Sequence, residues 1–267
     1  MSLGFSAEEL VHAGRGGGAL RMGLSRVAEA DWLQPNFDKA ERTAAFEAHP
    51  DAVRLLPQAE AAGREVAALL GVEGGLAEAV RACWEDLCLL QQGAASEYIL
   101  TAGVVGFPTD WRLPDKIGLP LIAVHAPIHG YAEQLASGVD HLFRTLPPGP
   151  IFGRANWFVV ADPAWRYMPT NEPADRFAHV TVANAGETLF VRCERQTLRR
   201  LPETGAVLFT IGIAVEPLGR LSTQAVRRVA DGIAATASGE HERRAAPFYA
   251  EALAGYAAGR MKMEPAT

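Results

Sequence analysis

The sequence predicts an α+β fold with a mainly antiparallel sheet enclosed by helices. The first third of the chain is rich in Ala, Leu and Glu, with apolar residues three and four positions apart, which is typical of helices. Short apolar runs separated by turn residues then indicate strands, and helical patterns return at the end. We expect a single domain over residues 1–267, with residues 1–20 as a loose N-terminal arm because Gly16-Gly17-Gly18 interrupts it.

Helices dominate the predicted N-terminal part. Their ranges are Glu41–His49, Pro57–Leu70 and Leu76–Gln92. Gly71 and the pair Gly74-Gly75 separate them, since glycine is unfavourable inside a helix.

The middle of the chain changes character. Residues Phe107 to Pro120 contain three prolines and one glycine, which predicts an irregular connection. The apolar run Leu121 to Val124 is predicted as a short strand, and Tyr131 to Leu146 as a helix that Pro147-Pro148-Gly149-Pro150 ends.

The second half supplies most of the predicted sheet. Strands are predicted over Trp157–Ala161, His179–Ala183, Thr188–Cys193 and Ala206–Val215. Asn184-Ala185-Gly186 has the composition of a hairpin turn. Two helices follow: one begins at the N-cap Ser222 and runs through Ala235, and the other covers Pro247–Arg260.

Composition excludes several classes of protein. The formal net charge of -6 and pI of about 5.7 do not suit general nucleic-acid binding. The three cysteines, Cys83, Cys88 and Cys193, form neither a disulfide framework nor a zinc pattern, so we expect reduced thiols. We also expect no signal peptide, since no basic segment precedes an apolar one near the start, and no membrane span, which needs ~20 apolar residues. These features together predict a soluble, cytoplasmic protein.

A cluster of charge lies where two predicted strands meet. Glu194, Arg195, Arg199 and Arg200 fall between Thr188–Val191 and Ala206–Ile211. Charged groups are costly to bury without partners, so the cluster faces a ligand, another charged segment or water. If the segment is helical, Arg195 and Arg199 share one face and suit carboxylates. The alternative is an internal ion-pair network with Glu194.

His125 is the first candidate for chemistry. It ends the apolar run before Pro127, so a rigid backbone holds the imidazole, which suits a metal or haem ligand or a general base. A half-buried structural histidine is the plainer interpretation. His129 stands four positions later, but proline and glycine oppose a helical zinc pair there. Lys116, beside Asp115, either binds an anion or is a solvated turn lysine.

Other side chains have the same two interpretations. Arg154 precedes a predicted strand and either binds an anion or faces solvent. Trp84, Trp111 and Trp157 either wall a pocket or belong to the core. The chain shows no G-x-G-x-x-G, P-loop, G-x-S-x-G or C-x-x-C motif, so a nucleotide or iron–sulfur site of its own is not predicted.

Two long segments resemble the haem-dependent oxidative N-demethylase family. The matching positions are Phe107-Pro108, Trp111, Lys116, Gly118, Leu121, His125, Pro127, Gly130-Tyr131, Arg154, Asn156-Trp157, Glu194–Leu198, Arg200–Pro202, Thr204–Val207 and Phe209–Ile211. With Arg21–Leu24 and Trp32-Leu33, the resemblance spans roughly Arg21 to Pro217. Departures occur at Pro114, one position late, and at His129, Glu203 and Gly212, which differ in type from the family pattern.

The resemblance implies a PAS-like haem b protein. It implies an oxygenase (alpha) subunit that demethylates a small secondary amine such as dimethylamine, giving amine and formaldehyde, with O2 and electrons from NADPH. Flavin (FMN) and a two-iron two-sulfur cluster would reside on a partner reductase. The alternative is a haem-binding PAS-like sensor or binding module without catalysis, or a haem-free binding domain in which the histidine is structural.

The resemblance also assigns roles to residues. His125 would bind the haem iron, with His129 or His179 as alternative ligands. Lys116, Arg195 and Arg200 would hold the propionates. A protonated alkylamine favours a carboxylate and an aromatic face. The candidates for these groups are Glu194, Asp115, Tyr131 and Trp157, and Trp157 would also lie beside the cofactor.

Overall fold

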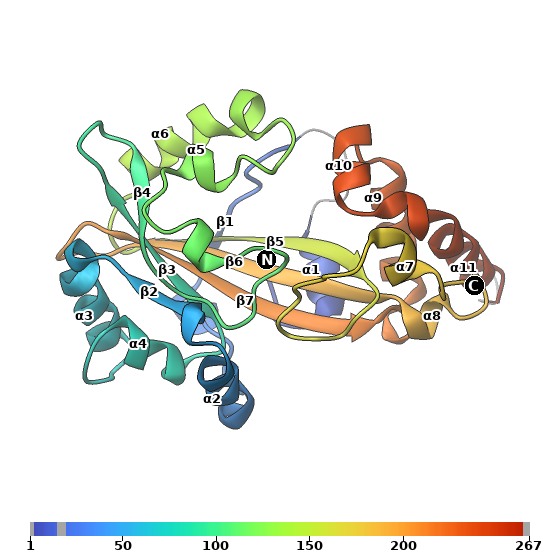
Figure 1. Cartoon of the computed structure of the whole chain (residues 1–267), viewed down its shortest axis with the longest axis horizontal. Helices are drawn as coiled ribbons and strands as arrows, with labels where there is room; N and C mark the ends of the chain where they lie inside the picture. Colours follow the sequence, from blue (N-terminus) through green and yellow to red (C-terminus); the bar gives the residue numbers. More distant parts are fainter. Residues whose placement is uncertain (1–2, 15–19, 264–267) are drawn as a thin grey trace. The chain divides into compact units, whose positions relative to one another are not determined.

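A seven-stranded antiparallel sheet organises the protein (Figure 1). The computed structural model describes residues 3–14 and 20–263. The strand order is β1-β5-β6-β7-β3-β4-β2. The strands are β1 (Ser25–Val27), β2 (Val53–Leu55), β3 (Asp86–Gln92), β4 (Tyr98–Val104), β5 (Ile151–Val160), β6 (Phe190–Arg200) and β7 (Val207–Pro217). The predicted α+β class and the mainly antiparallel sheet are therefore confirmed.

The chain divides into two compact units. Among the described residues, the first comprises 20–154 and 195–213, and the second comprises 3–14, 155–194 and 214–263. β5, β6 and β7 each contribute residues to both units. The single-domain boundaries stay a prediction.

The first unit holds most of the sheet and the segments that surround it. Its helices are α2 (Lys39–Ala48), α3 (Glu60–Leu69), α4 (Leu76–Ala79), α5 (Leu121–Val124) and α6 (Ser137–Thr145), with a π-helix η6 (Ala132–Ala136). Short 3-10 turns are η1 (Glu29–Asp31), η2 (Pro50–Ala52), η3 (Pro57–Ala59), η4 (Val80–Ala82) and η5 (Leu113–Asp115). In Figure 1, α5 and α6 lie on one side of these strands and α2 to α4 on the other.

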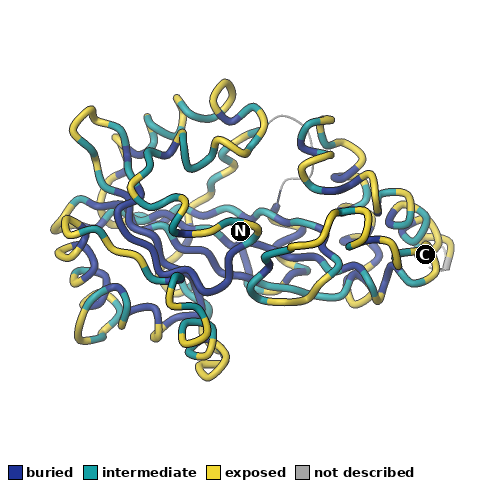
Figure 2. The backbone as a smooth tube through the Cα atoms, in the orientation of Figure 1, coloured by how far each residue is buried: buried dark blue, intermediate teal, exposed yellow. Residues whose placement is uncertain are grey.

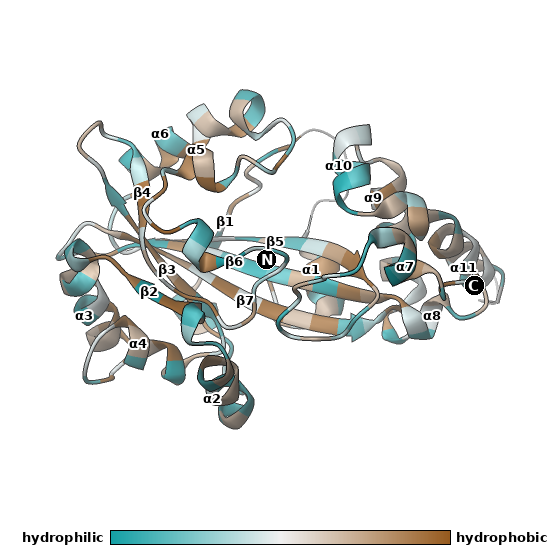
Figure 3. Ribbon diagram, in the orientation of Figure 1, coloured by the Kyte–Doolittle hydropathy of each residue, from teal (hydrophilic) through white to brown (hydrophobic). Residues whose placement is uncertain are grey.

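The core of the first unit forms where α5 and α6 cover the sheet. Phe143 and Leu146 from the end of α6 pack with Leu121 of α5 and with Leu90 and Leu198 of the sheet. Burying such large apolar side chains supplies roughly 1.5–3 kcal/mol each, which holds the two helices in place. Figures 2 and 3 show the strands beneath them as largely buried and hydrophobic.

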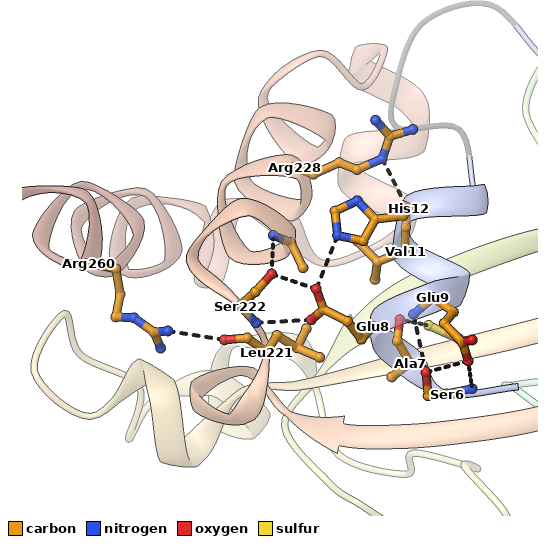
Figure 4. Close-up of polar contacts among 12 residues, drawn as sticks. Ser6, Ala7, Glu8, Glu9, Val11, His12, Leu221, Ser222, Arg228 and Arg260 are labelled. Atoms are coloured by element: carbon orange, nitrogen blue, oxygen red, sulfur yellow. Dashed lines mark hydrogen bonds and ion pairs between the residues drawn. The ribbon is translucent and has the colours of Figure 1, made fainter. Parts of the chain in front are cut away.

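The second unit is largely helical outside its strand ends. Its helices are α1 (Ala7–Ala13), α7 (Pro173–Phe177), α8 (Ala185–Thr188), α9 (Thr223–Ala234), α10 (Ser238–Arg243) and α11 (Ala250–Met263), with 3-10 turns η7 (Leu218–Arg220) and η8 (Ala246–Phe248). Polar contacts join α1 to α9 (Figure 4): Glu8 accepts hydrogen bonds from the Ser222 hydroxyl at 2.5 Å and amide at 2.9 Å. Arg228 donates to the carbonyls of Val11 and Gly14, at the end of α1.

Four predictions of local structure were wrong. Leu76–Gln92 is not one helix, because its second half pairs as β3 between β7 and β4, where both faces are buried. Leu121–Val124 is a helical turn rather than a strand: it follows Pro120 and packs Leu121 onto the sheet instead of pairing with a strand. His179–Ala183 is not a strand, and Asn184 begins α8 instead of a hairpin.

The N-terminal arm also differs from its prediction. Residues 7–13 form α1, which the Ser6–Glu9 capping box begins and which buries Leu10 and Val11. The remainder of the predicted arm, at residues 1–2 and 15–19, lies outside the described residues. In the part of the chain that the structure describes, no helix is long and apolar enough to cross a bilayer.

Candidate functional site

The imidazole of His125 has a defined tautomer. It follows α5, and its Nδ1 lies 2.8 Å from the backbone carbonyl oxygen of Leu121, one helical turn earlier. A carbonyl only accepts hydrogen bonds, so Nδ1 carries the proton and Nε2 keeps its lone pair. This is the arrangement of a histidine that binds a metal through Nε2 while a carbonyl orients the ring.

Tyr131 fixes the plane of that ring. The His125 and Tyr131 rings stack with centroids 4.4 Å apart and an interplanar angle of 12°. Burial, and secondarily the charge of Asp140, raise the pKa of Tyr131 to about 12, so its phenol stays protonated near neutral pH. The stack and the Leu121 carbonyl therefore restrain the imidazole at two places.

Two cations lie near His125. Burial lowers the pKa of His125, and the positive charges of Arg154 and Lys116 lower it further. The Lys116 ammonium donates to the Val124 carbonyl at 2.9 Å, which ties η5 to α5. The site thus holds a neutral imidazole with anion-binding groups around it.

Four apolar side chains of the first unit are only partly buried. Trp111, Ile117, Val124 and Phe209 pack around a buried cluster but remain partly exposed, and Val124 directly precedes His125 in the chain. Apolar surface of this kind is typical of ligand sites. It comes from the Pro-rich segment, α5 and β7, which the sequence separates by up to a hundred positions.

The Glu194–Pro202 segment has a different role from the predicted one. It is strand rather than helix, so alternate residues face opposite sides of the sheet. Arg195, 1% exposed, donates to the carbonyls of Trp32 and Asp31, at 2.7 Å in the first case. Thr197 accepts from the Trp32 indole, and Arg199 pairs with Glu29 at 2.5 Å. These odd-numbered side chains clamp the Glu29–Trp32 turn onto the sheet.

Arg200 lies on the opposite face of β6 from Arg195, and its donors bind other parts of the protein. Its guanidinium donates to the carbonyls of Leu146, Gly205 and Phe143 and to the Tyr98 hydroxyl. Two of these carbonyls belong to the last turn of α6, where an arginine satisfies groups that the helix cannot. Arg195 and Arg200 thus donate mainly to main-chain oxygens, a structural role that differs from the ion-pair network with Glu194 considered from the sequence.

The remaining predicted residues are not all brought together. Asp115, at the end of η5, is exposed, and so are the alternative ligands His129 and His179. Glu194 and Trp157 are buried in the second unit. The Trp157 ring packs near Gly14 beside α1, and its indole nitrogen has no hydrogen-bond partner among the described residues.

Sequence reasoning missed some members of the site. Leu121 contributes a backbone carbonyl, which no residue type reveals, although a helical spacing of four positions to His125 would have suggested it. Phe209 falls within the predicted strand Ala206–Val215, and Asp140 within the predicted helix Tyr131–Leu146, and neither was named as a candidate. Lys116, His125, Tyr131 and Arg154 are the predicted residues that the first unit does gather.

The ligand set offers a metal a single protein donor. Within residues 3–14 and 20–263, no group of three or more His, Cys, Asp or Glu side chains could hold a metal ion. One imidazole is the usual protein contribution to a haem iron, whose other ligands come from the porphyrin.

Comparison with known families agrees with this geometry. Residues 71–253 match the family described as haem-dependent oxidative N-demethylase, alpha subunit-like. The match covers more than half of the chain and includes the segment around His125 together with β5, β6 and β7. This chain therefore belongs to the haem-dependent oxidative N-demethylase alpha-subunit-like family.

Proposed function

We propose that the protein is the haem-binding oxygenase subunit of an oxidative N-demethylase that acts on a small secondary amine, dimethylamine or a close analogue. The observation that carries this proposal is the His125 tautomer: Nδ1 is committed to the Leu121 carbonyl and the Nε2 lone pair is left for iron. Family membership supports the reaction class.

The residues of the first unit fit a haem b group. His125 would supply the axial nitrogen, and Lys116 and Arg154 are two cations for the two propionate carboxylates. Trp111, Val124 and Phe209 would provide the apolar surface for the porphyrin. Arg195 and Arg200 do not belong to this set, because their donors hold the main chain.

Each residue would have a definite task. Bound haem would supply dioxygen activation and the oxidation of the N-methyl carbon. The His125 ring would supply a nitrogen ligand to the iron, Lys116 and Arg154 would bind carboxylate, and the apolar surface would exclude water. Tyr131, protonated near neutral pH, keeps a phenolic proton beside the site. We propose that an acidic side chain, for which Glu194 and Asp115 remain the candidates, receives the ammonium group.

Electrons would come from a partner subunit. An alpha-subunit-like family implies a system of several subunits. All three cysteines are buried, and burial raises the pKa of each thiol, to about 12 for Cys83, which disfavours the thiolates that iron–sulfur clusters need. We propose that FMN, a two-iron two-sulfur cluster and the NADPH site reside on that partner.

Haemin titration with a cavity variant tests the haem site. In His125→Gly, haemin should bind at least tenfold more weakly and lose the wild-type Soret band, and free imidazole should restore the band. The matched control is His129→Gly, an exposed histidine four positions away, which should bind haemin as the wild type does. Unchanged binding in His125→Gly would remove this histidine as the ligand.

The reaction needs a separate test. Dimethylamine should shift the Soret band of the haem-loaded protein, and with a chemical reductant and O2 the protein should release formaldehyde. A Soret band indifferent to alkylamines, in a protein that binds haem through His125, would favour a sensor or binding module over the enzyme.

A further inference from the structure

The helix after His125 contains a π-helical turn. Tyr131 begins this helix, η6 covers Ala132–Ala136 with π geometry, and α6 continues from Ser137 to Thr145. Such turns are rare, accommodate about one extra residue each, and occur frequently at functional sites.

The turn changes which residues share a face. Tyr131 and Phe143 are both buried, 5% and 4% exposed, although twelve positions separate them (143 − 131 = 12). An α-helix turns by about 100° per residue, so an uninterrupted α-helix would rotate Tyr131 roughly 120° away from the face of Phe143. The extra residue in η6 removes most of that rotation.

The contacts at both ends of this helix depend on its helical phase, that is, on the angle about the helix axis between Tyr131 and Phe143. Phe143 packs in the core with Leu121. Arg200 also binds carbonyls of the last turn of α6, so the C-terminal end of this helix cannot rotate. With that end fixed, the orientation of Tyr131 depends on how many residues lie in each turn between them. In the observed helix, Tyr131 stacks on His125 with ring centroids 4.4 Å apart.

We propose that the π-turn Ala132–Ala136 is a phasing device that keeps Tyr131 stacked on His125, and that Tyr131 is the positioning residue of the axial imidazole. The stack itself is a property of the haem-free chain. The consequence for haem, namely an axial ring held in one plane, rests on the proposed function.

Deleting Glu133 tests the phase directly. Glu133 is exposed within the π-turn, and its loss leaves the residue count of an ordinary α-helix. In the haem-free deletion variant, NMR should show the His125 ring protons shifting downfield as the ring current of Tyr131 is lost. Glu133→Ala is the matched control, because it removes the side chain and keeps the spacing. It should leave those shifts unchanged.

A pair of substitutions covers the case in which the deletion does not fold. Tyr131→Phe keeps an aromatic ring on His125, whereas Tyr131→Leu keeps apolar volume and removes the ring. We expect wild-type His125 shifts in the first and altered shifts in the second. In haem-loaded protein, Tyr131→Leu should release haem about tenfold faster and broaden the electron paramagnetic resonance signal that reports the imidazole plane, while Tyr131→Phe matches the wild type.

The outcomes separate the two proposals. If Tyr131→Leu and Tyr131→Phe give the same His125 shifts, or if the Glu133 deletion folds with wild-type shifts, the phasing role is overturned. If the shifts change as expected but the wild type binds no haemin, the stack stands and the haem function fails.

Discussion

Two segments of the first unit carry most of the sequence signature, and they use their polar groups differently. In residues 107–131, the imidazole of His125 uses Nδ1 to bind the main chain, and Nε2 keeps its lone pair. The Lys116 ammonium uses one of its three N–H donors to bind the Val124 carbonyl. In β6, Arg195, Arg199 and Arg200 direct their donors to carbonyls, to Glu29 and to a tyrosine hydroxyl. The first segment therefore keeps donor and acceptor atoms that could bind a ligand, whereas most donors of the arginines in β6 already bind the protein itself.

The difference shows why a dense charged motif is a poor guide to a ligand. Clamping an irregular turn or the end of a helix requires buried donors at fixed positions, just as binding an anion does. Clamping the main chain and binding an anion need the same residue types, and they differ only in the group that accepts the hydrogen bonds. The variants below are ordered from the largest expected effect to the smallest, and each tests one side of this comparison.

Arg195→Leu should have the largest effect, on stability. It leaves the Trp32 and Asp31 carbonyls without their donor and removes the charge opposite the buried Glu85. Losing one partner of a buried charged set costs about 3–5 kcal/mol, which urea denaturation would measure. If the variant unfolds like the wild type but loses haem, Arg195 belongs to the site and the clamp interpretation is wrong.

Lys116→Leu and Arg154→Leu should show the opposite behaviour. Each removes a cation near His125, and each should weaken haemin binding about tenfold, equivalent to about 1.4 kcal/mol, with a smaller effect on unfolding. Arg112→Leu is the matched control, since Arg112 is a nearby exposed cation whose partner is Asp51 at 3.7 Å. Equal haemin affinity in all three variants would show that neither Lys116 nor Arg154 holds a propionate.

Glu85→Gln tests the surroundings of Arg195 through the pH dependence of stability. Burial raises the pKa of Glu85, only partly offset by the Gln34 amide, which donates to Oε1 at 2.8 Å, and by Arg195. Above about pH 4.5 the unfolded chain releases this proton before the folded chain does, so the wild type loses stability relative to Glu85→Gln as pH rises. We expect the variant to gain about 1 kcal/mol on the wild type between pH 4 and pH 8, a usual size for one side chain. If the stability difference between Glu85→Gln and the wild type shrank as pH rises, the conclusion that burial raises the pKa of Glu85 would be wrong.

Sequence reasoning predicted the fold class, which the structure confirms, and a candidate site whose residues stay a prediction. Helical periodicity located α2, α3, α9 and α11 within a few residues, and the motif residues of the first segment do converge on His125. It failed where tertiary context decides. β3 reads as a continuation of a helix, because a central strand buried on both faces lacks the alternation of a half-buried one. Most partners of Arg195 and Arg200 are backbone oxygens, which have no sequence signature.

Glu8→Gln should have the smallest effect and serves as a reference outside the first unit. Although partial burial opposes it, hydrogen bonds from Ser222 and the nearby His12 hold the pKa of Glu8 below 4.5, its unperturbed value (Figure 4). A lowered carboxyl pKa stabilises the fold above the unfolded value, and this contribution disappears as pH falls through the folded value. Because the carboxylate is over a third exposed, screening limits the loss in Glu8→Gln at pH 7 to about 0.5 kcal/mol, and thermal unfolding should show it vanish below about pH 4. A loss that persists at low pH would mean that the bond to the start of α9 depends on shape rather than charge, and haemin binding should be unaffected at either pH.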